Sequence, residues 1–111
     1  MDWTAFIDET NGELAALRKA MPETAAGFSQ LAKAATGKGA LDPKTKELIA
    51  LAIGIDARCD GCIAFHVKAL VRLGVTREEI AETVAMAVYM GGGPSLMYGG
   101  KALAAFDELT G

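Results

Sequence analysis

The chain has 111 residues and a formal net charge of −3; hydrophobic residues make up 51% of it and aromatic residues only 6%. This length predicts a single domain over residues 1–111. The absence of a basic run argues against nucleic acid as a partner. No apolar run reaches the about 20 residues that a membrane-spanning helix needs, so we expect no membrane partner. The acidic start, MDWTAFIDETNGE, does not resemble a signal peptide, and we expect a cytoplasmic protein.

Glycines, prolines and capping residues divide the chain into predicted helices. Asp42 followed by Pro43 is typical of an N-cap and a first helical residue. Thr76 with Glu79 predicts a capping box, and the GGGP stretch at 91–94 predicts a break before a last helix. In chain order, the predicted helices cover residues 3–20, 22–36, 43–57, 59–73, 78–90 and 94–109.

The predicted fold is all-α, a compact bundle of five to six helices, because alanine is abundant and β-branched residues are few. The far half of helix 43–57 is apolar nearly all round, which predicts a central, buried helix. The polar face of helix 78–90 ends at Glu82, so the apolar faces of 83–98 are left over for a partner. We therefore expect an oligomer.

The stretch ARCDGCIAFHVKAL holds both cysteines and the only histidine of the chain. Cys59, Cys62 and His66 are spaced by three and four residues, so they share one face of helix 59–73. Leu70 continues the same stripe, which predicts that this face points inward. The three side chains are therefore expected at, or just beneath, the surface of the core.

A redox-active dithiol is one interpretation of this cluster. The positive end of a helix dipole and unpaired N–H groups lower the pKa of a nearby thiol from about 8.5 to about 3.5–7.5. Asp60, between the cysteines, opposes this effect. His66, one turn after Cys62, can accept its proton. Cys59 is placed to form a disulfide with an oxidised Cys62, and such short-loop disulfides are easily reduced.

Two other interpretations stay open. A zinc site usually needs four ligands, and here Cys59, Cys62 and His66 could be completed only by a carboxylate. Free cysteines and a hydrogen-bonded histidine are also ordinary core residues, although this explanation fits all three together less well.

Glu47 lies twelve residues before Cys59, with Leu48, Ile49 and Leu51 around it. A hairpin that turns near 57–59 could bring it back to the cysteine face. A buried carboxylate would then serve as a proton acceptor. Alternatively, Glu47 is a solvated charge near a helix N-terminus, where acidic residues are favoured.

The pattern of Glu47, eleven residues, CDGC, three residues and His66 resembles the Glu–Cys–Cys–His signature of the alkylhydroperoxidase D-like proteins. These belong to the carboxymuconolactone decarboxylase superfamily. The surroundings are also similar: LDPKTKELIALAIGI precedes the motif, and GVTREEIAETVAMAV and MGGGPSL follow it. The resemblance covers about residues 40–105.

The resemblance implies a peroxidase or thiol–disulfide oxidoreductase that forms homotrimers or homohexamers and needs neither a metal nor a flavin cofactor. Cys62 would attack a hydroperoxide and become a sulfenic acid, and Cys59 would resolve it. His66 and Glu47 would form a proton relay, and a lipoyl group or a thioredoxin-like protein would be the reductant. In thioredoxin the first cysteine attacks, so the reverse assignment stays open.

Two alternative functions remain. One is a lyase of the carboxymuconolactone decarboxylase type, although the decarboxylase members of the superfamily generally lack the cysteine pair. The other is a binding module in which the cysteines hold a metal or sense oxidation.

Overall fold

The structure is a computed structural model that describes residues 1–111, and it consists of six α-helices without a strand. The all-α prediction is confirmed, and the predicted helix ends agree with the observed ones to about one residue. The helices are α1 (Trp3–Ala20), α2 (Pro22–Thr36), α3 (Pro43–Asp56), α4 (Asp60–Arg72), α5 (Arg77–Gly91) and α6 (Gly93–Thr110).

Side-chain caps fix the helix starts that the sequence predicted. The carboxylate of Asp42 accepts the backbone N–H of Thr45 at 2.7 Å, and this bond lowers the pKa of Asp42. Thr76 and Glu79 form the predicted capping box at the start of α5. The hydrogen bond that the backbone N–H of Thr76 donates to the carboxylate of Glu79 lowers the pKa of Glu79. These bonds satisfy backbone donors that a helix start leaves free, so they help to define where α3 and α5 begin.

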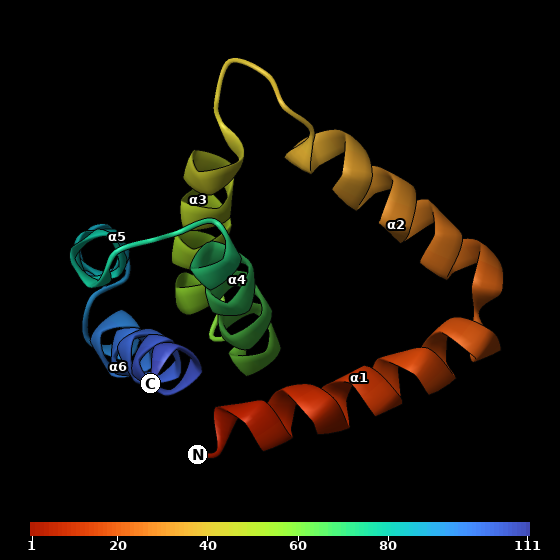
Figure 1. Ribbon diagram of the computed structural model, residues 1–111, viewed down its shortest axis with the longest axis horizontal. Coiled ribbons are helices and arrows are strands. Elements are labelled where there is room, and N and C mark those ends of the chain that lie inside the picture. Colours follow the sequence, from red (N-terminus) through yellow and green to blue (C-terminus); the bar gives the residue numbers. More distant parts are fainter.

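The core lies among α3, α4, α5 and α6, with α4 packed between α3 and α6 (Figure 1). Helix α5 approaches α6 closely because Gly99 has no side chain; a Cβ there would lie 2.4 Å from Cγ1 of Val84. The largest fully buried side chains come from α3, α4 and α5: Leu51, Ile55, Ile63, Val67, Leu70 and Ile80. These helices therefore form the packed core that carries the candidate site.

The prediction that the far half of α3 is buried all round is wrong for a single chain. Leu51 and Ile55 are fully buried, but Ile49 and Ile53 are exposed. The reason is that α4, α5 and α6 cover one side of α3, while α2 contacts it only slightly. An apolar strip therefore runs along the outer side of α3.

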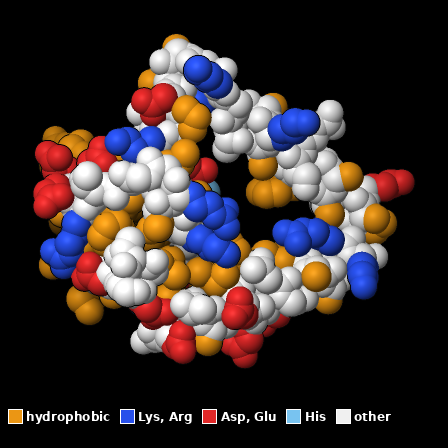
Figure 2. Space-filling model, in the orientation of Figure 1, with side chains coloured by type: hydrophobic (Ala, Val, Ile, Leu, Met, Phe, Trp, Pro, Cys, Tyr) orange, Lys and Arg blue, Asp and Glu red, His pale blue; other side chains and the backbone are white.

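Helices α1 and α2 form an arm that extends away from the other four helices (Figure 1). The start of α1 is anchored, because Trp3 and Ile7 are buried and the carboxylate of Glu108 accepts the backbone N–H groups of Trp3 and Thr4, each at 2.8 Å. In contrast, α2 has no buried residue. Figure 2 shows an opening between the arm and the rest of the molecule, with hydrophobic side chains on its rim.

None of the six helices is both long enough and apolar enough to cross a lipid bilayer.

Candidate active site

The turn between α3 and α4 presents the cysteines, and it depends on an unusual backbone conformation at Arg58. Arg58 has a φ of 57°, in the left-handed region that residues other than glycine seldom adopt. Its N–H donates to the carbonyl of Ile55, and the next N–H, of Cys59, donates to the carbonyl of Gly54, both at 3.0 Å. This pair of bonds is a Schellman motif, which ends α3 and holds Cys59 at the start of α4.

Cys59 is the N-cap residue of α4, and Cys62 lies in the first turn. The two sulfurs are joined as a disulfide, with the Cα atoms 5.2 Å apart. The sulfur of Cys59 also accepts the backbone N–H of Cys62 at 3.1 Å, as the oxygen of a capping serine would. Both residues are partly buried. The structure thus places the pair where the sequence predicted it, at the helix start and at the edge of the core.

Glu47 and His66 are brought together across the packed helices α3 and α4. Nδ1 of His66 lies 2.7 Å from Oε2 of Glu47, and the two side chains are 34% and 16% exposed. Of the two positions considered for Glu47, the structure has the largely buried one. With Glu47 as a carboxylate, the shared proton resides on Nδ1, so Nε2 of His66 is left free to accept another proton.

Asp60, the first residue of α4, has a partner that could not be predicted from its local sequence. Nζ of Lys101, on α6, donates to Oδ1 of Asp60 at 2.9 Å. The same ammonium lies 4.6 Å from the centre of the Tyr98 ring, one turn earlier on α6. The hydrogen bond to Asp60 raises the pKa of Lys101, so this lysine stays cationic.

Gly54 and Ser95 also shape the site, and sequence reasoning missed both. A Cβ at Gly54 would lie 3.0 Å from Cβ of Cys62, so this glycine lets the first turn of α4 approach α3. An isolated glycine inside an apolar helix is a recognised sign of such close packing. The buried hydroxyl of Ser95, on α6, donates to Asp56 at the end of α3, next to the Arg58 turn.

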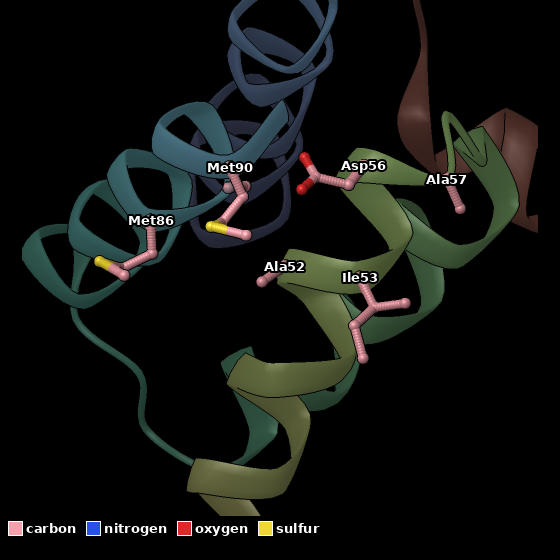
Figure 3. A pocket seen from close by; sticks show the side chains of 7 residues that line it. Ala52, Ile53, Asp56, Ala57, Met86 and Met90 are labelled. Atoms are coloured by element: carbon pink, nitrogen blue, oxygen red, sulfur yellow. The ribbon is translucent and has the colours of Figure 1, made fainter. Parts of the chain in front are cut away.

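A separate open cavity of about 410 Å³ lies between α3 and α5 (Figure 3). Its lining is apolar apart from Asp56, whose carboxylate points across the gap toward α5. None of the four sequence-predicted site residues lines it. The lining consists of Ala52, Ile53, Asp56, Ala57, Met86, Ala87 and Met90.

No three side chains among the histidine, cysteines, aspartates and glutamates are grouped so that they could hold a metal ion. The structure joins the four residues that the sequence singled out in two pairs: Cys59 with Cys62 at the start of α4, and His66 of α4 with Glu47 of α3. Such an arrangement offers a two-electron thiol–disulfide couple beside a histidine whose orientation a carboxylate fixes. The fold and the site together define an all-helical protein with a Cys-x-x-Cys pair at a helix start and a His–Glu pair one turn further on.

The carboxymuconolactone decarboxylase family model matches residues 22–108, and the chain belongs to this family. The resemblance to this superfamily is therefore confirmed. The chain is 55% identical to a family member from Legionella pneumophila of known structure, with a TM-score of 0.94 and coverage of 98% of this chain and 97% of that one.

Two more distant relatives extend the comparison. A family member from Thermotoga maritima, with a possible role in an antioxidative response, has a TM-score of 0.84 at 32% identity, over 94% of this chain and 89% of that one. An uncharacterised protein of Cupriavidus necator is 44% identical over 98% of this chain and 96% of its own length. The all-helical fold is thus shared along nearly the whole chain.

Proposed function

We propose that the protein is a thiol-dependent peroxidase that reduces hydroperoxides through Cys59 and Cys62. The observation that carries the proposal is a disulfide-forming pair in the first turn of α4 with, on the same helix, a histidine that contacts Glu47 of α3. The possible antioxidative role of the Thermotoga maritima relative supports the same class of reaction.

The proposed reaction has two steps. The thiolate of Cys62 attacks one oxygen of the hydroperoxide; the O–O bond breaks, an alcohol leaves with one proton, and Cys62 becomes a sulfenic acid. The thiolate of Cys59 then attacks that sulfur, the S–O bond breaks, and water leaves. Two thiols have supplied two electrons, and the product is the Cys59–Cys62 disulfide.

The His–Glu pair moves the protons in this scheme. His66 accepts the thiol proton of Cys62 at Nε2 and returns it to the leaving alkoxide, while Glu47 holds the ring through Nδ1 and stabilises the imidazolium that forms between the two events. The four-residue spacing puts His66 and Cys62 on the same side of α4.

A dithiol must then reduce the disulfide for a new cycle. A lipoyl group or a thioredoxin-like protein is the class of reductant we propose, since each delivers two electrons by thiol–disulfide exchange. The cytoplasm keeps such dithiols reduced, and we propose it as the location of the protein.

Reduced protein should consume about one equivalent of hydrogen peroxide per chain and lose both thiols, because the two cysteines supply one electron pair. A thiol count before and after peroxide, with mass spectrometry of the peptide that spans residues 58–68, measures this. Dithiothreitol should restore both thiols.

Two outcomes would contradict the proposal. Both thiols could remain free after peroxide, or Cys62 could be converted directly to a sulfonic acid, which would remove the resolving role of Cys59. Elemental analysis of the same preparation, purified without a chelator, is the control for the metal-binding alternative. Near-stoichiometric zinc with thiols released only by a chelator would favour that alternative.

We also propose that the protein is a homotrimer or homohexamer whose subunits cover one another's exposed apolar faces. A single chain leaves Phe28 and Leu31 of α2 69% and 63% exposed, and α2 has no buried residue of its own. Apolar side chains on α5 and α6 are also exposed, namely Met86, Tyr89, Met90, Leu96 and Met97. Surfaces of this kind mark protein–protein contacts.

Light scattering at micromolar concentration should give three or six times the chain mass of 11.5 kDa. The double substitution Phe28→Ser with Leu31→Ser should lower that mass, because it removes the apolar face of α2. Gln30→Ser, an exposed change on the same helix, is the matched control and should leave the mass unchanged. A monomeric wild-type protein would refute the proposal.

A further inference from the structure

An acidic residue lies between the two cysteines, and its negative charge opposes the formation of a thiolate at either of them. Asp60 is the chain neighbour of Cys59 and lies two residues before Cys62, in the first turn of α4. A carboxylate at this position stabilises the helix through the helix dipole. It also repels a thiolate nearby, so by itself it disfavours the ionised form of both cysteines.

The structure places a cation on that carboxylate from another helix. Lys101 Nζ lies 2.9 Å from Oδ1 of Asp60, and the two side chains are 37% and 32% exposed. The Tyr98 ring lies against the same ammonium at 4.6 Å, so a hydrogen bond and a cation–π contact both hold it. The lysine comes 41 residues after Asp60 in the chain, so tertiary packing creates this pair.

We propose that Lys101 is a positioning residue of the thiol site, which acts through Asp60 by neutralising its charge and so keeps the neighbouring cysteines ionisable near neutral pH. This inference rests on the proposed function for its significance, but the ionisation of the thiols can be measured without any peroxide. Its physical content is that the Asp60–Lys101 pair has no net charge, whereas Asp60 alone is an anion beside the thiolates.

The other charged groups near this end of α4 either have partners of their own or are exposed. On α4 itself, His66 is paired with Glu47 of α3, and from α3 the carboxylate of Asp56 accepts the hydroxyl of Ser95. The turn residue Arg58 is exposed. From α6 the groups are Lys101 and Tyr98, and no hydrogen bond or ion pair joins α1 to α4.

The experiment is the pH dependence of iodoacetamide alkylation of the reduced protein, followed separately at Cys59 and Cys62 by mass spectrometry. Lys101→Met should move the half-maximal rate to higher pH and slow alkylation at pH 7 by about threefold to tenfold, because it exposes the charge of Asp60. Lys101→Arg keeps a cation and should stay close to wild type. Asp60→Asn should move the profile to lower pH, because it leaves the cation of Lys101 unpaired beside the thiols. The double variant Asp60→Asn with Lys101→Met, which has neither charge, should return close to the wild-type profile.

Lys44→Met is a matched control, because Lys44 forms an ion pair with Glu79 at the same distance of 2.9 Å, with exposures of 36% and 31%, between α3 and α5. It should leave the alkylation profile unchanged. An unchanged profile in Lys101→Met would overturn the inference. A double variant shifted as far to higher pH as Lys101→Met alone would also overturn it, because Lys101 would then not act by neutralising Asp60. If Lys101→Met does not fold, the Asp60→Asn profile decides: no shift toward lower pH overturns the inference.

Peroxide consumption by the same variants separates this inference from the proposed function. If the wild type consumes no peroxide while the alkylation profiles shift as described, the peroxidase proposal fails and the role of Lys101 stands. If peroxide is consumed and the profiles do not shift, the reverse holds.

Discussion

Replacement of Cys62 by serine is expected to reduce peroxide turnover to the uncatalysed background, a loss of about 10³-fold or more. The physical reason is that a serine hydroxyl is neither ionised at neutral pH nor able to form a disulfide, so both steps of the proposed reaction lose their sulfur. Losses of this size are usual when an enzyme's nucleophile is removed. Steady-state consumption of hydrogen peroxide, with dithiothreitol as reductant, measures the effect.

Cys59→Ser is the matched control, because it removes the other sulfur of the pair. Under the proposed assignment it still reacts once, and a sulfenic acid at Cys62 should be trapped by dimedone. Excess peroxide should then convert Cys62 to sulfinic acid, since no partner thiol rescues it. A dimedone adduct on Cys59 in the Cys62→Ser variant, with none on Cys62 in the Cys59→Ser variant, would reverse the assignment of attacking and resolving residues.

One structural feature favours the reverse assignment. In the disulfide form the sulfur of Cys59 accepts the N–H of Cys62 at 3.1 Å, so a helix donor is directed at Cys59. In the proposed scheme the same donor has a different use. It stabilises the thiolate of Cys59 when that thiolate attacks the sulfenic acid and when the reductant later displaces it.

Helix ends were predictable because they depend on short-range chemistry. Asp42, Pro43 and the Thr76–Glu79 box act within one turn, and each does so in the structure as the sequence indicated. The left-handed turn at Arg58 gave no comparable signal, because that position most often holds glycine. The course of the arm was not predictable either, because α2 has no buried residue whose pattern could fix its direction.

The difference between short-range contacts and contacts made by tertiary packing also explains what could be predicted of the site. Cys59, Cys62 and His66 lie on one helix, so their spacing alone predicts a shared face. Glu47 could be placed only as one of two alternatives, since its contact with His66 requires α3 to fold back on α4. The contact of Lys101 with Asp60 could not be predicted, because nothing in the local sequence shows that these two residues, 41 positions apart, meet.

His66→Ala is expected to slow the reaction with peroxide by about 10²–10⁴-fold without unfolding the protein, because it removes the group that takes and returns the proton. The side chain is 34% exposed, so its loss leaves no closed cavity in the core. Glu47→Gln should also slow the reaction, but less, because glutamine can still accept the Nδ1–H and only the negative charge is lost. Stopped-flow rates of thiol loss between about pH 5 and 9, with circular dichroism as the folding control, measure both effects.

The two substitutions should combine non-additively if Glu47 acts through His66. Once the imidazole is gone, the carboxylate has no proton acceptor to orient, so the double variant should be about as slow as His66→Ala alone. Glu82→Gln, on the exposed side of α5, is the matched control for Glu47→Gln and should have no effect. Full activity of Glu47→Gln across the whole pH range would remove Glu47 from the relay. Fully additive losses would instead mean that Glu47 and His66 act on separate steps, with their 2.7 Å contact serving only to join α3 to α4.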